Sequence, residues 1–131
     1  MRVTTTREDK VSEFNEAAGQ AKGWDYLALE LRLKLLREEF YELELEVADA
    51  IYLQKHHKRE PGEEHKAAIL KEMCDLQYVL SGLAVSLDLP LEEAFNRVHA
   101  NNMTKLGGPV REDGKIMKPE GYKKVNLEDM V

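Results

Sequence analysis

Two apolar stripes, each interrupted by carboxylates, constrain this sequence more than any other feature. The stripes are Leu31, Leu35, Glu38, Glu42 and Leu45, and Ala68, Glu72, Asp75, Val79 and Leu83, with spacings of three and four residues throughout. Such spacing places residues on one face of an α-helix. Acidic side chains therefore occupy positions that a packed helical bundle normally fills with Leu or Val.

Carboxylates that crowd an inward face are unfavourable, because they repel one another and lose their hydration. A cation between them removes both penalties, and all-oxygen ligands suit a hard cation such as Mg²⁺. The clusters E-E-x-x-E at 38–42 and E-x-x-D at 72–75 therefore predict a metal site between two helices. A single Glu-rich helix is more often a solvated face, but two clusters in register with apolar stripes favour the metal site.

The remaining pattern predicts an all-α fold, a four-helix bundle with a short C-terminal hairpin or tail. We expect helices over about 8–21, 26–57, 65–87 and 90–107, with Asp25 capping the second. The dipeptide Asp113-Gly114 predicts a tight hairpin turn in the tail. A length of 131 residues suits a single domain, 1–131, whose tail is 107–131.

The second predicted helix carries another apolar stripe, which is nearly a coiled-coil repeat. Its members are Leu29, Leu33, Leu36, Phe40, Leu43, Val47 and Ile51. A helix that is apolar on two sides needs a partner for each side. We therefore expect a homodimer or a homotetramer, built by pairing these long helices.

Composition excludes several classes of protein. A formal net charge of −6 argues against binding of a nucleic-acid polymer through a basic surface. No apolar run approaches the roughly 18 residues of a transmembrane helix, so we expect no membrane partner. The single cysteine, Cys74, fits a reducing cytoplasm, and we expect it to be a buried structural thiol.

The paired acidic motifs and their flanking segments resemble the MazG-like nucleoside triphosphate pyrophosphohydrolases. This all-α superfamily also contains phosphoribosyl-ATP pyrophosphohydrolases and dimeric dUTPases. The similar segments are V-S-E-F at 11–14, L-R at 31–32, V-H-A-N-N-M-T-K-L at 98–106, D-G-K at 113–115 and K-P-E-G-Y at 118–122. Two departures are Asn15, where we expect His in many relatives, and the charged insert at 58–64.

The resemblance implies Mg²⁺-dependent hydrolysis of a nucleoside triphosphate between its α and β phosphates, with Mn²⁺ as an alternative ion. The products would be a nucleoside monophosphate and pyrophosphate, and the role would be house-cleaning of the nucleotide pool. The implied metal ligands are Glu39, Glu42, Glu72 and Asp75, and Glu38 is implied to orient or deprotonate the attacking water. The implied substrate-binding residues are Asn15, Asn101, Asn102, Lys105, Lys118 and Tyr122.

Several alternatives stay open at this point. Glu38 is either the general base or a further metal ligand. The substrate is either an ordinary or damaged nucleoside triphosphate or phosphoribosyl-ATP of histidine synthesis, and neither base nor sugar is fixed. A different class of protein is a catalytically silent helical module that binds a nucleotide or a metal, or that only oligomerises.

Overall fold

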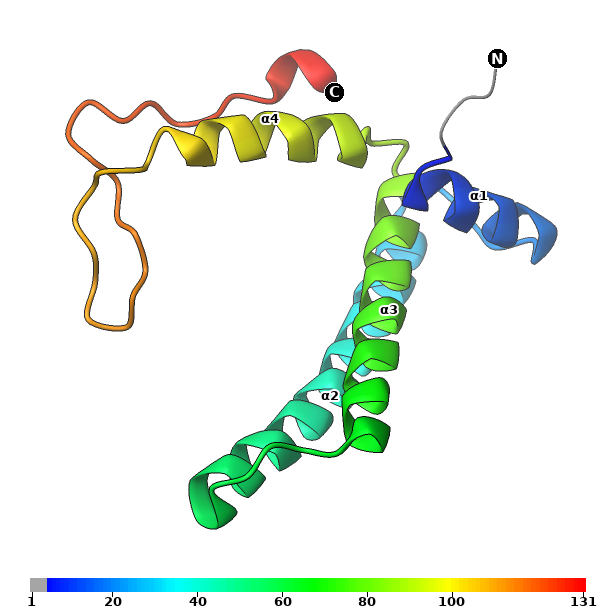
Figure 1. Ribbon diagram of the computed structural model, residues 1–131. Helices are drawn as coiled ribbons and strands as arrows, with labels where there is room; N and C mark the ends of the chain where they lie inside the picture. Colours follow the sequence, from blue (N-terminus) through cyan, green and yellow to red (C-terminus); the bar gives the residue numbers. More distant parts are fainter. Residues whose placement is uncertain (1–4) are drawn as a thin grey trace. The chain divides into compact units, whose positions relative to one another are not determined.

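The computed structural model describes residues 5–131, which form four α-helices and a short C-terminal 3₁₀ helix (Figure 1). These elements are α1 (Arg7–Ala17), α2 (Tyr26–His57), α3 (Glu63–Ser86), α4 (Leu91–Met103) and η1 (Glu128–Met130). Residues 5–131 contain no β-strand, only an isolated antiparallel bridge between Val110 and Ile116. The expected all-α class, with bundle-type helices and a short C-terminal tail, is confirmed. No helix among these residues is both long and apolar enough to cross a membrane.

The chain divides into two compact units, the first ending at Asp88 and the second spanning Leu89–Val131. In the first unit, α2 and α3 form a long helical hairpin, and α1 packs against α3. The second unit consists of α4 and the tail, which returns to the helix where Arg97 binds Asp129 and the carbonyl of Asn126.

The helix boundaries follow from local backbone chemistry. Asp25 caps α2 as expected, because its Oδ1 accepts a hydrogen bond from the backbone N–H of Ala28 at 3.0 Å. Helix α1 ends at Ala17, earlier than the expected position near 21. The reason is Gly19, whose φ of +66° turns the chain out of the helix, so that the N–H of Gln20 bonds back to the carbonyl of Asn15.

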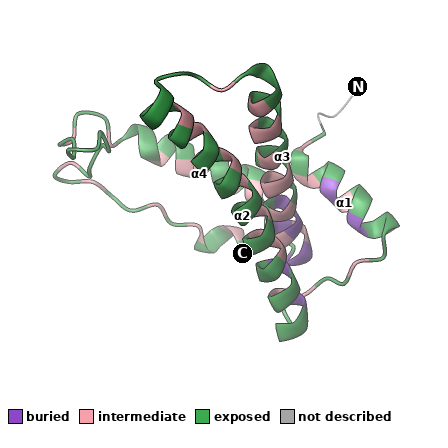
Figure 2. Ribbon diagram, turned by 90° about the horizontal axis from the view of Figure 1, so that it is seen from below, coloured by how far each residue is buried: buried purple, intermediate pink, exposed green. Residues whose placement is uncertain are grey.

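The interior of the first unit is small and unusually polar. The buried positions are Val11, Asn15, Ala28, Arg32, Ser81, Gly82, Ala84, Ser86 and Leu87. Figure 2 shows that they gather on α1 and on the adjoining ends of α2 and α3. The rest of the helical hairpin, from residue 33 to residue 80, contains no buried residue. This part of the hairpin has no core of its own within the protomer.

The second apolar stripe of α2 lies largely in solvent. Leu33, Phe40, Val47 and Ile51 are exposed by 47%, 52%, 37% and 59% of their surfaces. Our expectation that Cys74 is buried is wrong, because its thiol is exposed. Successive helical residues are rotated by about 100°, so Cys74 points away from the face that carries Glu72 and Asp75.

The tail contains the expected turn at Asp113-Gly114. The N–H of Arg111 bonds to the carbonyl of Lys115 at 2.8 Å, and the N–H of Gly114 bonds to the carbonyl of Arg111 at 2.8 Å. The guanidinium of Arg111 also binds the carboxylate of Asp113. A short hairpin therefore follows α4, although its two arms are too irregular to be strands.

Candidate active site

Three of the four predicted metal ligands come together between α2 and α3. Glu39 from α2 meets Glu72 and Asp75 from α3, and one carboxylate oxygen of each lies within 4.8 Å of the others. We call these residues the acid trio. All three side chains are half-buried, so water screens the repulsion between their charges less than it would at the surface. The spacing of three residues between Glu72 and Asp75 puts both on the face of α3 that meets α2.

The electrostatics of the acid trio fit a bound cation. Burial raises the pKa of Glu39, and the neighbouring charges of Asp75, Glu72 and Glu42 raise it further, while Lys71 opposes the shift. The ionised form of Glu39 is therefore less stable here than in water, and a nearby positive charge would offset this cost. The donors are all carboxylate oxygens, which is the set that hard divalent ions take.

Glu42 and Glu38 lie beside the acid trio rather than within it. Both side chains are exposed, and neither belongs to the convergent group. Glu42 is near enough for its charge to contribute to the raised pKa of Glu39. Glu38 precedes Glu39 on the same turn of α2 and faces solvent. Their roles as fourth ligand and general base stay predictions.

Lys71 is a site residue that the sequence reasoning missed. Its ammonium lies 2.5 Å from Oδ2 of Asp75, and this hydrogen bond raises the pKa of Lys71. The spacing Lys71-x-x-x-Asp75 was the available signal, because residues four apart on a helix are neighbours. The ion pair brings one positive charge to the edge of the acid trio.

A second group of convergent ligands lies farther along the same pair of helices. Glu46, Asp49 and His65 each offer an atom within 4.8 Å of the others. The Nε2 of His65 lies 2.9 Å from the carbonyl oxygen of Glu46 and 3.2 Å from its Oε2. Sequence reasoning missed His65, because only the antiparallel register of α2 and α3 brings it to Glu46.

Asn15, predicted to bind substrate, lies in the buried end of the first unit. It is 4% exposed and Arg32 is 2% exposed. The Nδ2 of Asn15 and the Nε of Arg32 have no hydrogen-bond partner among the described residues. A Cβ on Gly82 would lie 3.1 Å from Nη1 of Arg32 and 3.8 Å from Nδ2 of Asn15. The glycine therefore makes room for both side chains.

The buried pair and the acid trio share one helical register. Arg32 precedes Glu39 by seven residues on α2, and Gly82 follows Asp75 by seven residues on α3. Seven residues are nearly two helical turns, or roughly 10 Å along the axis. Arg32 and Asn15 therefore lie about two turns from the acid trio along the α2–α3 interface. Burial lowers the pKa of Arg32. No acid among the described residues forms an ion pair that would oppose this shift.

In the second unit, four other predicted substrate-binding residues form one cluster. Nδ2 of Asn101 donates a hydrogen bond to the hydroxyl of Tyr122 at 2.6 Å. The ammonium groups of Lys105 and Lys118 each lie 5.6 Å from the centroid of the Tyr122 ring. We call this the tyrosine cluster. Asn102 is exposed and lies outside it.

A comparison with protein-family models identifies the family of this chain. Residues 6–102 match the family model described as phosphoribosyl-ATP pyrophosphohydrolase. The chain belongs to this family. A search of curated proteins found no match. Membership in the phosphoribosyl-ATP pyrophosphohydrolase family identifies a pyrophosphohydrolase of the MazG-like superfamily, a hydrolase of acid anhydrides that acts on nucleotides and depends on a divalent metal.

The family match divides the predicted site residues into two sets. One set falls inside the matched residues. It consists of the acid trio together with Glu38, Glu42, Asn15, Asn101 and Asn102. Lys105, Lys118 and Tyr122 lie beyond residue 102, so the tyrosine cluster extends from the phosphoribosyl-ATP pyrophosphohydrolase domain into the tail.

Proposed function

We propose that this chain hydrolyses a nucleoside triphosphate between the α and β phosphates, with Mg²⁺, to give a nucleoside monophosphate and pyrophosphate. The observation that carries the proposal is the convergence of Glu39, Glu72 and Asp75 within 4.8 Å, together with the raised pKa of Glu39. A triphosphate would be repelled by this acidic surface unless divalent ions neutralised it.

The acid trio would hold the metal, with Glu42 as a fourth ligand from the next turn of α2. When bound, a divalent ion neutralises the charge of the phosphates and of the developing leaving group. The ammonium of Lys71 forms an ion pair with Asp75 and brings one positive charge to the edge of the acid trio. These acids therefore act by charge and position, and they form no covalent bond to the substrate.

Glu38 would serve the attacking water. Its carboxylate is exposed on the turn of α2 that carries Glu39, so a water molecule can reach it. In the proposed step, the water oxygen forms a bond to phosphorus as the α–β bridging P–O bond breaks. The water proton passes to the Glu38 carboxylate, and the electron pair of the broken bond leaves on the pyrophosphate or the monophosphate.

The predicted substrate-binding residues fall in both units, and each group is proposed by itself. Asn15, with Arg32 beside it, offers buried donors that suit a base or a sugar. In the tyrosine cluster, Lys105 and Lys118 offer point charges to phosphate oxygens, and Asn101 fixes the hydroxyl of Tyr122. Exposed Asn102 would add a hydrogen bond to the nucleotide.

We also propose that the chain acts as a homo-oligomer, a dimer or a tetramer. The support is the exposed stripe of Leu33, Phe40, Val47 and Ile51 on a part of the hairpin that has no buried residue. Soluble monomers rarely expose continuous apolar patches of more than a few hundred Å². A second copy of the hairpin would cover this stripe and complete a four-helix core.

Release of pyrophosphate across a panel of canonical, deoxy and damaged nucleoside triphosphates tests the proposal. We expect turnover of at least one of them with Mg²⁺, and loss of that turnover in Glu39→Gln. Glu44→Gln, an exposed acid on the same helix, is the matched control and should stay active. A selective preference for non-standard bases would support a house-cleaning role.

Phosphoribosyl-ATP is the second candidate substrate, and the family match fits it equally well. Its hydrolysis also releases pyrophosphate and would use the same acids, so the two candidates differ only in the group attached to the nucleotide. Including phosphoribosyl-ATP in the panel separates them. Absence of turnover for every substrate, in a folded protein loaded with Mg²⁺, would instead identify a silent binding module.

A further inference from the structure

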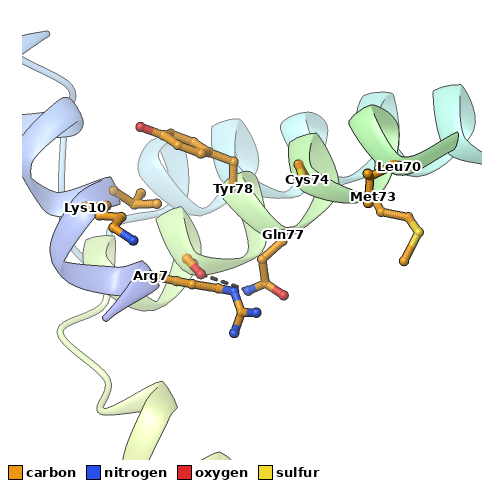
Figure 3. Close-up of a pocket in the computed structure, with 9 residues that line it drawn as sticks. Arg7, Lys10, Leu70, Met73, Cys74, Gln77 and Tyr78 are labelled. Atoms are coloured by element: carbon orange, nitrogen blue, oxygen red, sulfur yellow. Dashed lines mark hydrogen bonds between the residues drawn. The ribbon is translucent and has the colours of Figure 1, made fainter. Parts of the chain in front are cut away.

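A pocket on the outer face of α3 lies away from the acid trio. It has a volume of about 390 Å³, is open to solvent and is lined by residues of α1 and α3 (Figure 3). Its lining residues are Arg7, Lys10, Val11, Leu70, Met73, Cys74, Gln77, Tyr78 and Ser81. The α3 members recur every three or four residues on one face. That face is turned well away from Glu72 and Asp75, because neighbouring residues differ by about 100°.

The charge of this pocket contrasts with that of the whole chain. Arg7 and Lys10 supply two cations from the first turns of α1, and no acidic residue lines the pocket. Neither cation forms an ion pair with any described residue. Oε2 of Glu8 accepts a hydrogen bond at 2.6 Å from the hydroxyl of Ser81, which lines the pocket, and the buried Oε1 of Glu8 has no hydrogen-bond partner among the described residues. In a protein with a net charge of −6, an unpaired double cation selects for an anion.

The rest of the pocket is suited to an apolar or aromatic body. Leu70, Met73 and Tyr78 form its wall along α3. The Tyr78 ring is held in place by an edge-to-face contact with Phe14, with centroids 5.7 Å apart. Nε2 of Gln77 donates a hydrogen bond to the buried hydroxyl of Ser81 at 2.9 Å, which fixes the side chain of Gln77. A pocket of this volume is within the range of small-molecule sites.

We propose that this pocket is a second, metal-independent site for a nucleoside monophosphate. The phosphate dianion matches the two cations in charge, and the base matches the apolar and aromatic wall. A triphosphate carries twice the charge and would need the divalent ions for which this pocket has no ligands. The choice of a nucleotide rests on the proposed function, because a monophosphate is its product, and the site would let the product regulate the enzyme.

Protection of Cys74 from a thiol reagent tests this site directly. Cys74 lines the pocket, is exposed and is the single cysteine of the chain. The rate of its modification by a disulfide reagent would be measured with excess EDTA, against a panel of nucleoside monophosphates, the uncharged nucleosides and inorganic phosphate. We expect at least one monophosphate to slow the reaction at concentrations where its nucleoside and phosphate alone do not.

The double variant Arg7→Ala/Lys10→Ala supplies the decisive comparison. Loss of each charge-assisted hydrogen bond should weaken binding about tenfold or more. Lys22→Ala/Lys34→Ala removes the same charge from exposed positions outside the pocket and should keep full protection. Both variants remove exposed side chains, and circular dichroism checks that they fold.

Three results would overturn the inference. One is the absence of protection by every monophosphate, and another is equal protection by the uncharged nucleoside or by phosphate alone. The third is a change of oligomeric state in Arg7→Ala/Lys10→Ala, which would make this face a contact between copies of the chain. The assay needs no turnover, so it stands or falls independently of the catalytic proposal.

Discussion

The ammonium of Lys71 lies 2.5 Å from Oδ2 of Asp75, at the edge of the three carboxylates of Glu39, Glu72 and Asp75. The two side chains are 69% and 31% exposed, so water and salt screen much of their attraction. Lys71 therefore offsets only part of the repulsion among the acids. The repulsion that remains should affect the stability of the metal-free protein and the dependence of that stability on pH.

Asp75→Asn should remove activity without weakening the metal-free fold. Loss of a ligand should lower turnover by at least about 100-fold, since even outer-shell partners cost 10–100-fold. In EDTA the variant should melt at the same temperature as the wild type or higher, because one repelling charge has gone. Thermal unfolding followed by circular dichroism measures this, with Glu44→Gln as control. A metal-free variant that melts well below the wild type would contradict the prediction.

Stability of the metal-free protein should depend on Glu39 in a defined pH window. Its folded-state pKa is raised by burial and by Asp75, Glu72 and Glu42, so the folded state holds its proton to higher pH than the unfolded chain. Stability is then lost as pH rises from the ordinary carboxylate pKa of 4.5 through the raised value. Glu39→Gln should lack this loss, so its advantage over the wild type in denaturant titrations should be larger at pH 7 than at pH 4.5. An advantage that is independent of pH would refute this explanation.

Activity should require a divalent ion that prefers oxygen ligands. Excess chelator should abolish turnover, Mg²⁺ should restore it and Mn²⁺ should substitute, because the proposed ligands are carboxylates. Circular dichroism in chelator is the control that the chain stays folded. Full activity in excess chelator would disprove the metal assignment, as would a tightly bound Zn²⁺ as the sole active ion.

Charges placed on the second stripe of α2 should dissociate the assembly. Phe40→Asp and Val47→Asp each put a carboxylate on the exposed apolar surface that a second copy would cover. Sedimentation velocity at micromolar concentration should show smaller species than the wild type, with activity lost in parallel. Ala48→Asp, exposed on the same helix but off the stripe, should leave the assembly intact. The prediction fails if the wild type is a fully active monomer.

The tyrosine cluster should contribute to substrate affinity. Lys105→Ala and Lys118→Ala each remove an ammonium that lies 5.6 Å from the Tyr122 ring. Each should raise KM about tenfold, the effect of a lost charge-assisted hydrogen bond. Lys123→Ala, whose side chain is exposed beside the cluster, is the matched control. An unchanged KM in both variants would exclude the tail lysines from substrate binding.

Much of the first unit could be predicted from spacing alone. The cap at Asp25, the long extent of α2 and the shared face of Glu72 and Asp75 are local properties of a chain that turns about 100° per residue. The predicted inward stripe of α2 was wrong, because it placed Glu38 and Glu42 on the inward face, whereas both are exposed and Glu39 is half-buried. The end of α1 was missed because a single glycine, Gly19, stopped the helix before its apolar pattern ended. The exposure of Cys74 was missed because the sequence does not show which face of α3 other helices cover.

The sequence by itself determined which faces of the helices carry acids and which carry apolar side chains, because a helical face depends only on residues a few positions apart. Tertiary structure alone decided which residues of different segments come into contact. It aligned Glu39 rather than Glu38 with Glu72 and Asp75, set His65 against Glu46, and folded Tyr122 onto Asn101. These contacts join residues 19 or more positions apart. They depend on the register of two packed helices and on the position at which the tail contacts α4. Packing within each unit fixes both.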